Sequence, residues 1–405
     1  MRKFLINSFF FFSLMPFVSP LPIGSDVQPV SAILAFILLF WAALERNFRL
    51  TTLTMTFLAL AIFSLIYAGF DTNNLFELRH RVGLVFASIT FIALIFYLME
   101  FSKKILMLAI VVNFFGVVWH FFLPDSFIVI GELFVREIKQ TAGGRGASGF
   151  AAESSFTAIT AMVQFLTAYF YYLKEKVSKQ FLIWSFFLCL AIILITGSGT
   201  GVIYTTILFA IFTISRLSLK SIILISIVSP ILVFLFLNSS ISENTRGGFL
   251  LKLLITNPSI LLIDGSISER LLSLEIGLRS LQEYPLGKGG GSYSETAIML
   301  DEKYSIISKY TNYGISPARA NAYLFETVSS FARYTIELGF LFVLFLVFLF
   351  TQSYSLNNFS LISLTLALLL ILVSFSILFP PTYLLLAASY SLRNNNIKMI
   401  SDEVL

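Results

Sequence analysis

Arginine, glycine and a carboxylate come together in the segment 143–153, in a pattern suited to binding an anion. Arg145 lies among four glycines, at positions 143, 144, 146 and 149, and Glu153 follows just before an apolar run. Glycines let backbone N–H groups approach an anionic oxygen closely, and an arginine adds bidentate hydrogen bonds to a phosphate or carboxylate. The alternative is a flexible loop that leads into a capped helix, where the helix dipole favours Glu153.

A second polar region predicts a helix that carries two arginines. Ser266 and Glu269 have the spacing of a capping box, and the helix is expected to end before Pro285, where a glycine loop follows. Arg270 and Arg279 are nine residues apart, which is about 900° of helix rotation, so they face opposite ways. The alternative is an amphipathic helix on a membrane surface, with its arginines at the headgroups.

The apolar residues of this helix form one stripe. Four leucines repeat at helical spacing: Leu271, Leu274, Leu278 and Leu281. Residues three and four apart lie on one side of a helix, so these leucines share a face. Arg270 lies on another face, together with the small residues Ser273, Gly277 and Ser280.

Further polar residues follow before the next apolar run. Arg319, Asn321 and Glu326 precede a run that contains Arg333 and Glu337. Charges so close to a membrane segment are costly and usually have a partner or a task. The alternative is an interfacial Arg333–Glu337 pair at i, i+4 spacing. A separate glycine-containing stretch, residues 196–201, is interpreted as a tight turn rather than as a phosphate site.

The elements that position these residues must be membrane helices. The chain has 405 residues, of which 57% are hydrophobic and 12% are charged. Soluble domains are about 45–50% apolar and about 25% charged, so the excess fits lipid as the solvent. The single cysteine excludes an intrachain disulfide, and two histidines make a poly-His metal site improbable. The scattered basic residues do not favour nucleic-acid binding.

Hydropathy predicts an all-α polytopic membrane protein with about twelve transmembrane helices. The expected spans are 4–22, 27–44, 51–69, 82–99, 105–123, 153–173, 181–196, 200–215, 221–237, 331–350, 359–379 and a short twelfth at 380–392, which begins with two prolines and is expected to be tilted or partly interfacial. We read the first run as an uncleaved span. The chain then forms one integral membrane domain, residues 1–405, with extracytoplasmic loops at 124–152 and 238–330.

The distribution of basic residues predicts the orientation of these spans. With the N-terminus in the cytoplasm, short basic segments such as 1–3, 103–104 and 174–179 also lie in the cytoplasm. The longer loops of mixed charge then lie outside, as the positive-inside rule requires. Both termini are cytoplasmic, which requires an even number of spans.

The order of these features resembles the O-antigen polymerase and ligase superfamily. Its members have about a dozen spans and a large periplasmic loop, in which an arginine precedes a helix and then Pro-x-Gly-x-Gly. Arg270 and the segment 285–289 match this order, and Asn321 followed by Glu-Leu-Gly at 337–339 resembles the next element. The segment 144–156 resembles the Wzy polymerase loop in which Arg and Gly precede Glu-Pro-Ser, with Ser154 in place of the proline.

The resemblance implies a GT-C-like, lipid-linked-donor glycosyltransferase in polysaccharide (lipopolysaccharide-type) biosynthesis. It would act at the periplasmic face of the bacterial inner membrane and use undecaprenyl-pyrophosphate-linked oligosaccharide, with a chain-length regulator as a possible partner. The substrate-binding residues would be Arg145, Arg270, Arg279, Arg319 and Asn321. Glu153 and Glu326 are the candidate groups for orienting or deprotonating the acceptor hydroxyl. No cofactor or metal is expected, because no outer loop holds an Asp-x-Asp-like pair.

Two other functions remain open at this stage. A ligase that transfers glycan to another acceptor usually carries a histidine before the asparagine, where this chain has Ala320. A lipid-linked oligosaccharide transporter or flippase would place its charges inside the spans, along a central path. This chain concentrates its charges in the loops instead, and so the polymerase is the preferred interpretation.

Overall fold

The computed structural model describes residues 1–20, 22, 27–45, 50–67, 75–136, 138, 146–214, 238, 252, 265–312, 316–325, 327, 329–374 and 377–404. Regular structure in these ranges is entirely helical, as the sequence predicts. The helices of the first half are α1 (Arg2–Leu14), α2 (Val30–Leu44), α3 (Thr52–Tyr67), α4 (Leu75–Tyr97), α5 (Lys103–Phe122), α6 (Pro124–Gly131), α7 (Ser154–Leu173), α8 (Lys179–Thr196) and α9 (Gly199–Ile214).

The second half adds further helices and one π-helical turn. They are α13 (Gly265–Glu283), α14 (Tyr293–Tyr304), α15 (Ile306–Thr311), α16 (Pro317–Phe325), α17 (Ser330–Leu338), α18 (Phe340–Ser353), α19 (Asn358–Leu369), the π turn η2 (Leu370–Ser374) and α20 (Pro380–Val404). The expected span at 221–237, the start of the large loop and most of segment 137–145 lie outside the described residues.

Long apolar helices account for much of the bundle. Three described helices are long and apolar enough to cross a membrane by length and composition, namely α5, α7 and α8. Shorter apolar helices are Val30–Leu44, Thr52–Tyr67, Val82–Tyr97, Gly199–Phe212, Phe340–Ser353 and Asn358–Val373. The outward face of α8 is strongly apolar, since Trp184 is 65% and Leu194 is 67% exposed. A surface of this kind suits contact with lipid better than contact with water.

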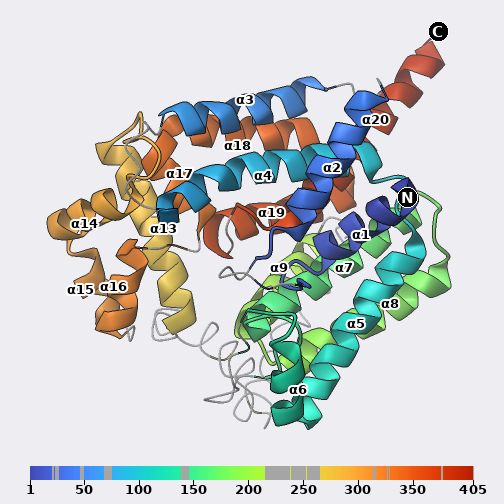
Figure 1. The fold of residues 1–405 in the computed structure, drawn as a ribbon, viewed down its shortest axis with the longest axis horizontal. Coiled ribbons are helices and arrows are strands. Elements are labelled where there is room, and N and C mark those ends of the chain that lie inside the picture. The colour runs from blue at the N-terminus through green and yellow to red at the C-terminus, as the bar shows by residue number, and fades with distance from the viewer. Residues whose placement is uncertain are drawn as a thin grey trace.

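The connections between helices gather at two opposite ends of the bundle. At one end, here called the terminal end, Arg2 forms a 3.2 Å ion pair with Glu100, which follows α4. Lys176, which follows α7, donates a hydrogen bond to the Met99 carbonyl at the same end. Both chain termini also lie on this side of the molecule, to the right in Figure 1. The segments predicted to share one compartment therefore meet in space.

The opposite end, here called the loop end, collects the other set of connections. The Ser19 N–H donates to the Phe134 carbonyl at 2.9 Å and so joins the segment after α1 to the one after α6. Ser329 Oγ donates to the Leu372 carbonyl in η2 at 2.7 Å. Helices α13 to α16 lie away from both termini, to the left in Figure 1.

A buried polar contact ties three helices together inside the bundle. Asn113 of α5 donates to the side-chain oxygen of Gln164 in α7 at 3.2 Å. Gln164 in turn donates to the Leu14 carbonyl at the end of α1, also at 3.2 Å. Polar side chains inside an apolar bundle are stable when they satisfy one another, and such pairs fix the register of neighbouring helices.

Helices α13 to α16 form a helical unit with a hydrophobic core of its own. This core includes Leu272, Ile276, Tyr293, Leu300, Ile306 and Leu324, together with Ala332 and Ile336 from α17. In its described part, residues 265–312 and 316–325, the large loop before the last helices is thus a folded helical structure.

The leucine stripe of α13 does not coincide with its buried face. Leu278 of the leucine stripe is 49% exposed, whereas Ser273 and Ser280 are fully buried. A Cβ added at Gly277 would lie 2.9 Å from the Phe331 ring and 3.0 Å from the Ala332 Cα atom. The helix therefore packs on α17 through its small residues, which allow a close backbone approach that leucine side chains would prevent.

The predicted continuous span at 331–350 is interrupted. Helix α17 ends at Leu338 and α18 begins at Phe340, because Gly339 adopts φ 59° and ψ −139°. The last helix, α20, extends to Val404 and is longer than the predicted span at 380–392. Its first turns are buried within the protein, since Tyr383 and Leu386 are at most 1% exposed and lie in the main core.

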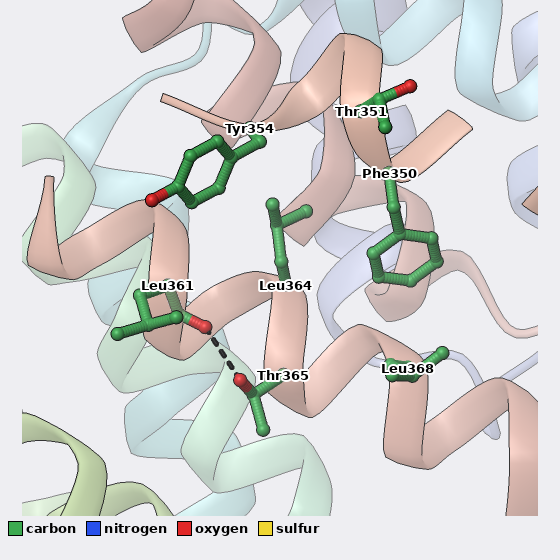
Figure 2. A pocket seen from close by; sticks show the side chains of 7 residues that line it. All are labelled: Phe350, Thr351, Tyr354, Leu361, Leu364, Thr365 and Leu368. Atoms are coloured by element: carbon green, nitrogen blue, oxygen red, sulfur yellow. Dashed lines mark hydrogen bonds between the residues drawn. The ribbon is translucent and has the colours of Figure 1, made fainter. Parts of the chain in front are cut away.

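A cavity of about 390 Å³ lies between α18 and α19. Figure 2 shows the side chains that line it, which are mainly apolar, such as Phe350, Leu364 and Leu368. The Thr365 hydroxyl beside it donates to the Leu361 carbonyl at 2.8 Å, so this polar group is already satisfied. The cavity offers little to hold a charged ligand, and the chemistry must be sought at the loop end.

Candidate functional site

Arg270 reaches from the loop unit to the start of a bundle helix. Its guanidinium Nη1 donates a 2.8 Å hydrogen bond to Thr200 Oγ1, at the second residue of α9. The same turn is capped by Ser198, whose Oγ accepts from the Gly201 N–H at 3.1 Å. The first N–H groups of a helix are favourable positions for an anion, and here an arginine lies beside them.

The start of α9 lies against α7, the helix that follows Glu153. A Cβ added at Gly201 would lie 2.6 Å from the Ala158 Cβ, so the two helices are in close contact near their first turns. Glu153 is half-buried and precedes the first residue of α7. Arg270, Thr200 and Glu153 therefore come from three separate elements that meet at the loop end.

Glu153 occupies the N-cap position, although its side chain makes no capping hydrogen bond to the helix backbone. Its carboxylate instead lies 3.5 Å from the Ser155 hydroxyl, which can donate to it. The backbone carbonyl of Glu153 accepts from the Phe156 N–H at 3.1 Å. The backbone thus starts the helix, and the side chain takes no part in capping.

The segment after Arg145 is held at several points. The Ser148 N–H donates to His120 Nδ1 at 3.2 Å, and the Ser148 carbonyl accepts from the Thr157 hydroxyl. A Cβ added at Gly146 would overlap the Thr196 carbonyl at the end of α8. Arg145 itself lies outside the described residues, but the chain on its C-terminal side is fixed beside α7 and α8.

His120 acts as a buried hydrogen-bond acceptor in this arrangement. It is 1% exposed, and its ring stacks on Phe127 with centroids 4.9 Å apart. Because Nδ1 accepts from the Ser148 N–H, the proton of the neutral ring is on Nε2. The residue positions the segment 146–150 and does not act as a base through Nδ1.

This arrangement predicts different outcomes for two substitutions of His120. His120→Leu leaves the buried Ser148 N–H unpaired and should lower the free energy of unfolding by about 1–3 kcal/mol. His120→Asn keeps an acceptor atom at the position of Nδ1 and should recover much of that loss. Thermal unfolding in detergent measures both variants. Equal destabilisation by Leu and Asn would show that ring packing on Phe127, rather than the hydrogen bond, holds the segment.

The two glycine motifs of the second half cross each other backbone to backbone. The Lys288 N–H donates to the Ile336 carbonyl at 2.8 Å, and the Gly289 N–H donates to the Glu337 carbonyl at 3.0 Å. The Phe340 N–H donates to the Pro285 carbonyl at 2.8 Å. The segments 285–289 and 337–339 thus form one structural unit, here called the glycine clasp.

A buried ion pair supports the glycine clasp. Arg333 Nη1 lies 3.6 Å from Glu337 Oε1, and the two side chains are 8% and 1% exposed. Glu337 Oε1 also accepts from the Gly291 N–H at 3.3 Å, and Arg333 lies over the Tyr293 ring at 5.0 Å. Burial raises the pKa of Tyr293 to about 12, although the nearby Thr327 and the charge of Arg333 oppose this shift. The i, i+4 pair named as the alternative exists, and it is buried within the protein.

Arg279 lies away from Arg270, as their nine-residue spacing predicts. Its guanidinium is 3.8 Å from the Glu275 carboxylate, donates to Gln282 at 3.2 Å and lies 4.5 Å above the Tyr304 ring. These contacts belong to the surface of the loop unit. The structure therefore does not bring Arg279 to Arg270 and Thr200.

The remaining predicted residues belong to the end of the large loop. Asn321 is exposed on α16, whereas Ala320 beside it is fully buried in the core of the loop unit. The Arg319 side chain and Glu326 lie outside the described residues. Among the residues that the structure describes, no group of three or more His, Cys, Asp and Glu side chains is arranged to hold a metal ion.

Sequence reasoning missed Thr200 and the positioning role of His120. The turn 196–201 is a tight turn as interpreted, and the structure adds that it receives Arg270. The sequence offers one signal for it, since Ser198, Gly199 and Thr200 begin an apolar helix with capping residues. Seventy residues separate Thr200 from Arg270, so no local pattern could pair them.

No family model matches this chain, and no curated protein matches it. Its function is therefore inferred from the geometry of the site and the order of its motifs.

Proposed function

We propose that this chain is a polysaccharide polymerase of the O-antigen type in the bacterial inner membrane. It transfers a growing glycan from undecaprenyl pyrophosphate to the non-reducing-end hydroxyl of a lipid-linked repeat unit. The observation that carries this proposal is the 2.8 Å hydrogen bond between Arg270 and Thr200, which brings the loop arginine to the start of α9. Near its start α9 packs on α7, the helix that Glu153 precedes. In this proposal the loop end faces the periplasm and the terminal end faces the cytoplasm.

The reaction makes defined demands on these groups. A glycosidic bond forms between the acceptor oxygen and the reducing-end sugar carbon of the donor, and the bond from that carbon to the pyrophosphate oxygen breaks. Negative charge develops on the leaving pyrophosphate, and an arginine beside helix N–H groups stabilises that charge. The acceptor hydroxyl loses a proton, and Glu153 is the proposed acceptor of that proton because it lies in the segment that resembles the polymerase Glu-Pro-Ser pattern.

The glycine clasp supports the same interpretation. The Pro-x-Gly-x-Gly segment and the Glu-Leu-Gly segment are separate elements of the family pattern, and here they are joined by backbone hydrogen bonds. The clasp holds α13 against α17, and α13 carries Arg270. Two motifs that resemble the superfamily thus share one task, which is to fix the helix that presents the arginine.

Two alternatives fit the structure less well. A ligase would need a catalytic group at position 320, but Ala320 is fully buried in the core of the loop unit. A transporter would need charged side chains along the bundle interior. The contact between Asn113 and Gln164 is neutral and joined to the α1 backbone. The buried charges Arg333 and Glu337 pair with each other beside the glycine clasp.

The proposed orientation predicts where reporter fusions will be active. Fusions at Gly131 and Gly290 should report an extracytoplasmic position, and a fusion at Lys176 should report a cytoplasmic one. The physical reason is the excess of basic residues in the short connections of the terminal end. Paired alkaline phosphatase and green fluorescent protein fusions measure this. A cytoplasmic result at Gly290 would overturn the proposal, because the site would face the wrong compartment.

If Glu153 is the base, replacing its carboxylate should lower the rate of polymerisation. Glu153→Gln is nearly isosteric and removes the carboxylate, so polymerisation should fall by about 10²–10⁴-fold, the contribution typical of a positioned base. Glu326→Gln is the comparison, because Glu326 is the second candidate from sequence. Polymerisation rates of the two variants, measured across pH 6–8, show which of the two carboxylates the reaction needs. If both variants keep full rates over this range, neither is the base and departure of the pyrophosphate carries the reaction.

A further inference from the structure

An apolar cavity of about 490 Å³ lies between α7, α8, α9 and α19, away from the residues of the candidate site. Its deep wall includes the buried side chains of Cys189 and Ile362. Other lining side chains also lie on the outer surface of the bundle, since Phe186 is 44% and Phe209 is 68% exposed. The cavity is therefore open sideways, toward the lipid that would surround α8 in a membrane.

The length of the cavity matches one leaflet of a bilayer. Its lining runs from Met162 to Leu173 on α7 and from Leu182 to Ile193 on α8. Each of these walls is about 17 Å long, and half of the hydrocarbon core of a bilayer is about 15 Å. The lining of α7 begins about 12 Å from Ser154, the first residue of that helix at the loop end. The cavity thus occupies the half of the bundle next to the terminal end.

Lys179 continues one wall of this cavity at the terminal end. It is exposed and is the first residue of α8. It precedes the lining residues Leu182 and Phe186 by three and seven positions, so it lies on the lining face of the helix, one turn beyond the cavity. An ammonium group at this place suits the phosphate of a lipid whose acyl chain lies in the cavity.

A second lysine follows the other wall. Lys174 comes directly after Leu173, the last lining residue of α7, and its ammonium lies 5.9 Å from the centre of the Phe170 ring. Burial lowers the pKa of Lys174, because the ammonium loses part of its hydration, and a phosphate oxygen beside it would compensate for that loss. The connection 174–179 holds three lysines and one carboxylate, that of Glu175, and so is positively charged.

We propose that this cavity binds an acyl chain of an anionic phospholipid, phosphatidylglycerol, whose phosphate group lies at Lys174 and Lys179. The lipid belongs to the leaflet at the terminal end, where its chain fills the space between four helices. An acyl chain gains little hydrophobic free energy on leaving the bilayer, because the bilayer is as apolar as the cavity wall. The two lysines therefore supply the preference for an anionic headgroup. The inference does not depend on the proposed function, since the site lies at the opposite end of the molecule from Arg270.

Two adjacent phenylalanines of α8 provide a matched test. Phe186 lines the cavity, whereas Phe187 is 57% exposed and lies outside it. Each in turn is replaced in the full-length protein by benzoylphenylalanine, whose excited ketone inserts into nearby C–H bonds. The protein is placed in nanodiscs of equal amounts of phosphatidylglycerol and phosphatidylethanolamine, without any polyprenyl lipid, and is irradiated. Mass spectrometry then gives the ratio of phosphatidylglycerol adducts to phosphatidylethanolamine adducts at each position.

We expect this ratio to be about tenfold higher at position 186 than at position 187, a preference of about 1.4 kcal/mol. The same replacement at Phe209, which lines the cavity from α9, should reproduce the enrichment if the variant at 186 folds poorly.

Replacement of the lysines tests where the headgroup lies. Lys179→Gln should lower the ratio at position 186 several-fold, because it removes one of the two positive charges. The addition of Lys174→Gln should bring the ratio down to that at position 187. Lys3→Gln is the control for the first change, since Lys3 is exposed at the terminal end on α1, a helix that lies outside the cavity lining. This variant should leave the ratio unchanged.

Equal ratios at positions 186 and 187 overturn the proposal. Adducts at 186 with protein alone also overturn it, because a second copy or another segment of the chain would then fill the cavity. A ratio that stays high after both lysines are replaced contradicts the assigned headgroup position. An equal fall with Lys3→Gln would show that the overall surface charge attracts the lipid, and it too would remove the site.

Discussion

Arg270→Ala is expected to lower kcat/KM for polymerisation by about 10²–10³-fold, the loss typical when one donor to a developing charge is removed. The physical reason is that the hydrogen bond to Thr200 holds the positively charged guanidinium of Arg270 at the start of α9. Arg270→Lys should recover only part of the rate, because lysine keeps the charge but loses the planar fork that holds two oxygens. Initial rates with lipid-linked repeat units measure both variants.

A matched control for Arg270 lies at the terminal end. Arg393 also joins two helices, since its Nη1 donates to the Thr351 carbonyl at 2.7 Å and to Gln352 at 3.2 Å. Arg393→Ala should therefore cost some stability without a comparable loss of rate. A normal polymerisation rate for Arg270→Ala at normal expression would contradict the proposed site. Helix α13 would then have a structural role only, as a helix at the membrane surface.

Gly339→Ala is expected to have the largest effect on folding. Gly339 has φ 59° and ψ −139°, a conformation that alanine adopts only with strain. The added Cβ would also overlap the Pro285 carbonyl in the glycine clasp. Strain alone costs about 1–3 kcal/mol, and the overlap forces the two backbones apart. Thermal unfolding in detergent and the yield of folded protein should both fall.

Gly83→Ala provides the comparison for this substitution. Gly83 is helical, and an added Cβ would lie 3.5 Å from the Leu378 side chain, an ordinary contact distance. Alanine in a helix interior is favoured over glycine by about 0.5–1 kcal/mol, so this variant should be neutral or slightly more stable. A Gly339→Ala protein as stable as the Gly83→Ala protein would contradict the role assigned to the glycine clasp.

The sequence predicts the parts of this structure that depend on local pattern. Hydropathy places α2, α3, α5, α7, α8 and α9 within about three residues of their observed bounds, whereas α1 ends at Leu14 instead of at residue 22. The basic segments at 1–3 and 174–179 come together at one end as expected. The opposite directions of Arg270 and Arg279 also follow, because they depend only on helix rotation. These features need no knowledge of what lies beside each helix.

The remaining features depend on contacts between distant segments. The break at Gly339 is not predicted, because the partner that holds this glycine, the segment 285–289, is about fifty residues away in the sequence and joins it through backbone hydrogen bonds. The buried face of α13 is set by how closely α17 approaches, which favours Ser273 and Gly277 over leucine. In the same way, the contact of Arg270 with Thr200 depends on how the loop unit sits on the bundle.

The most direct test of the proposed function is a reaction with purified components. The full-length protein in liposomes is incubated with undecaprenyl-pyrophosphate-linked repeat units. The products are separated by size, and their masses are measured by mass spectrometry. The proposal predicts a ladder whose steps equal one repeat unit, with one undecaprenyl pyrophosphate released for each bond formed. Units that cross the bilayer without any covalent change, or a single transfer to a different acceptor, would contradict it.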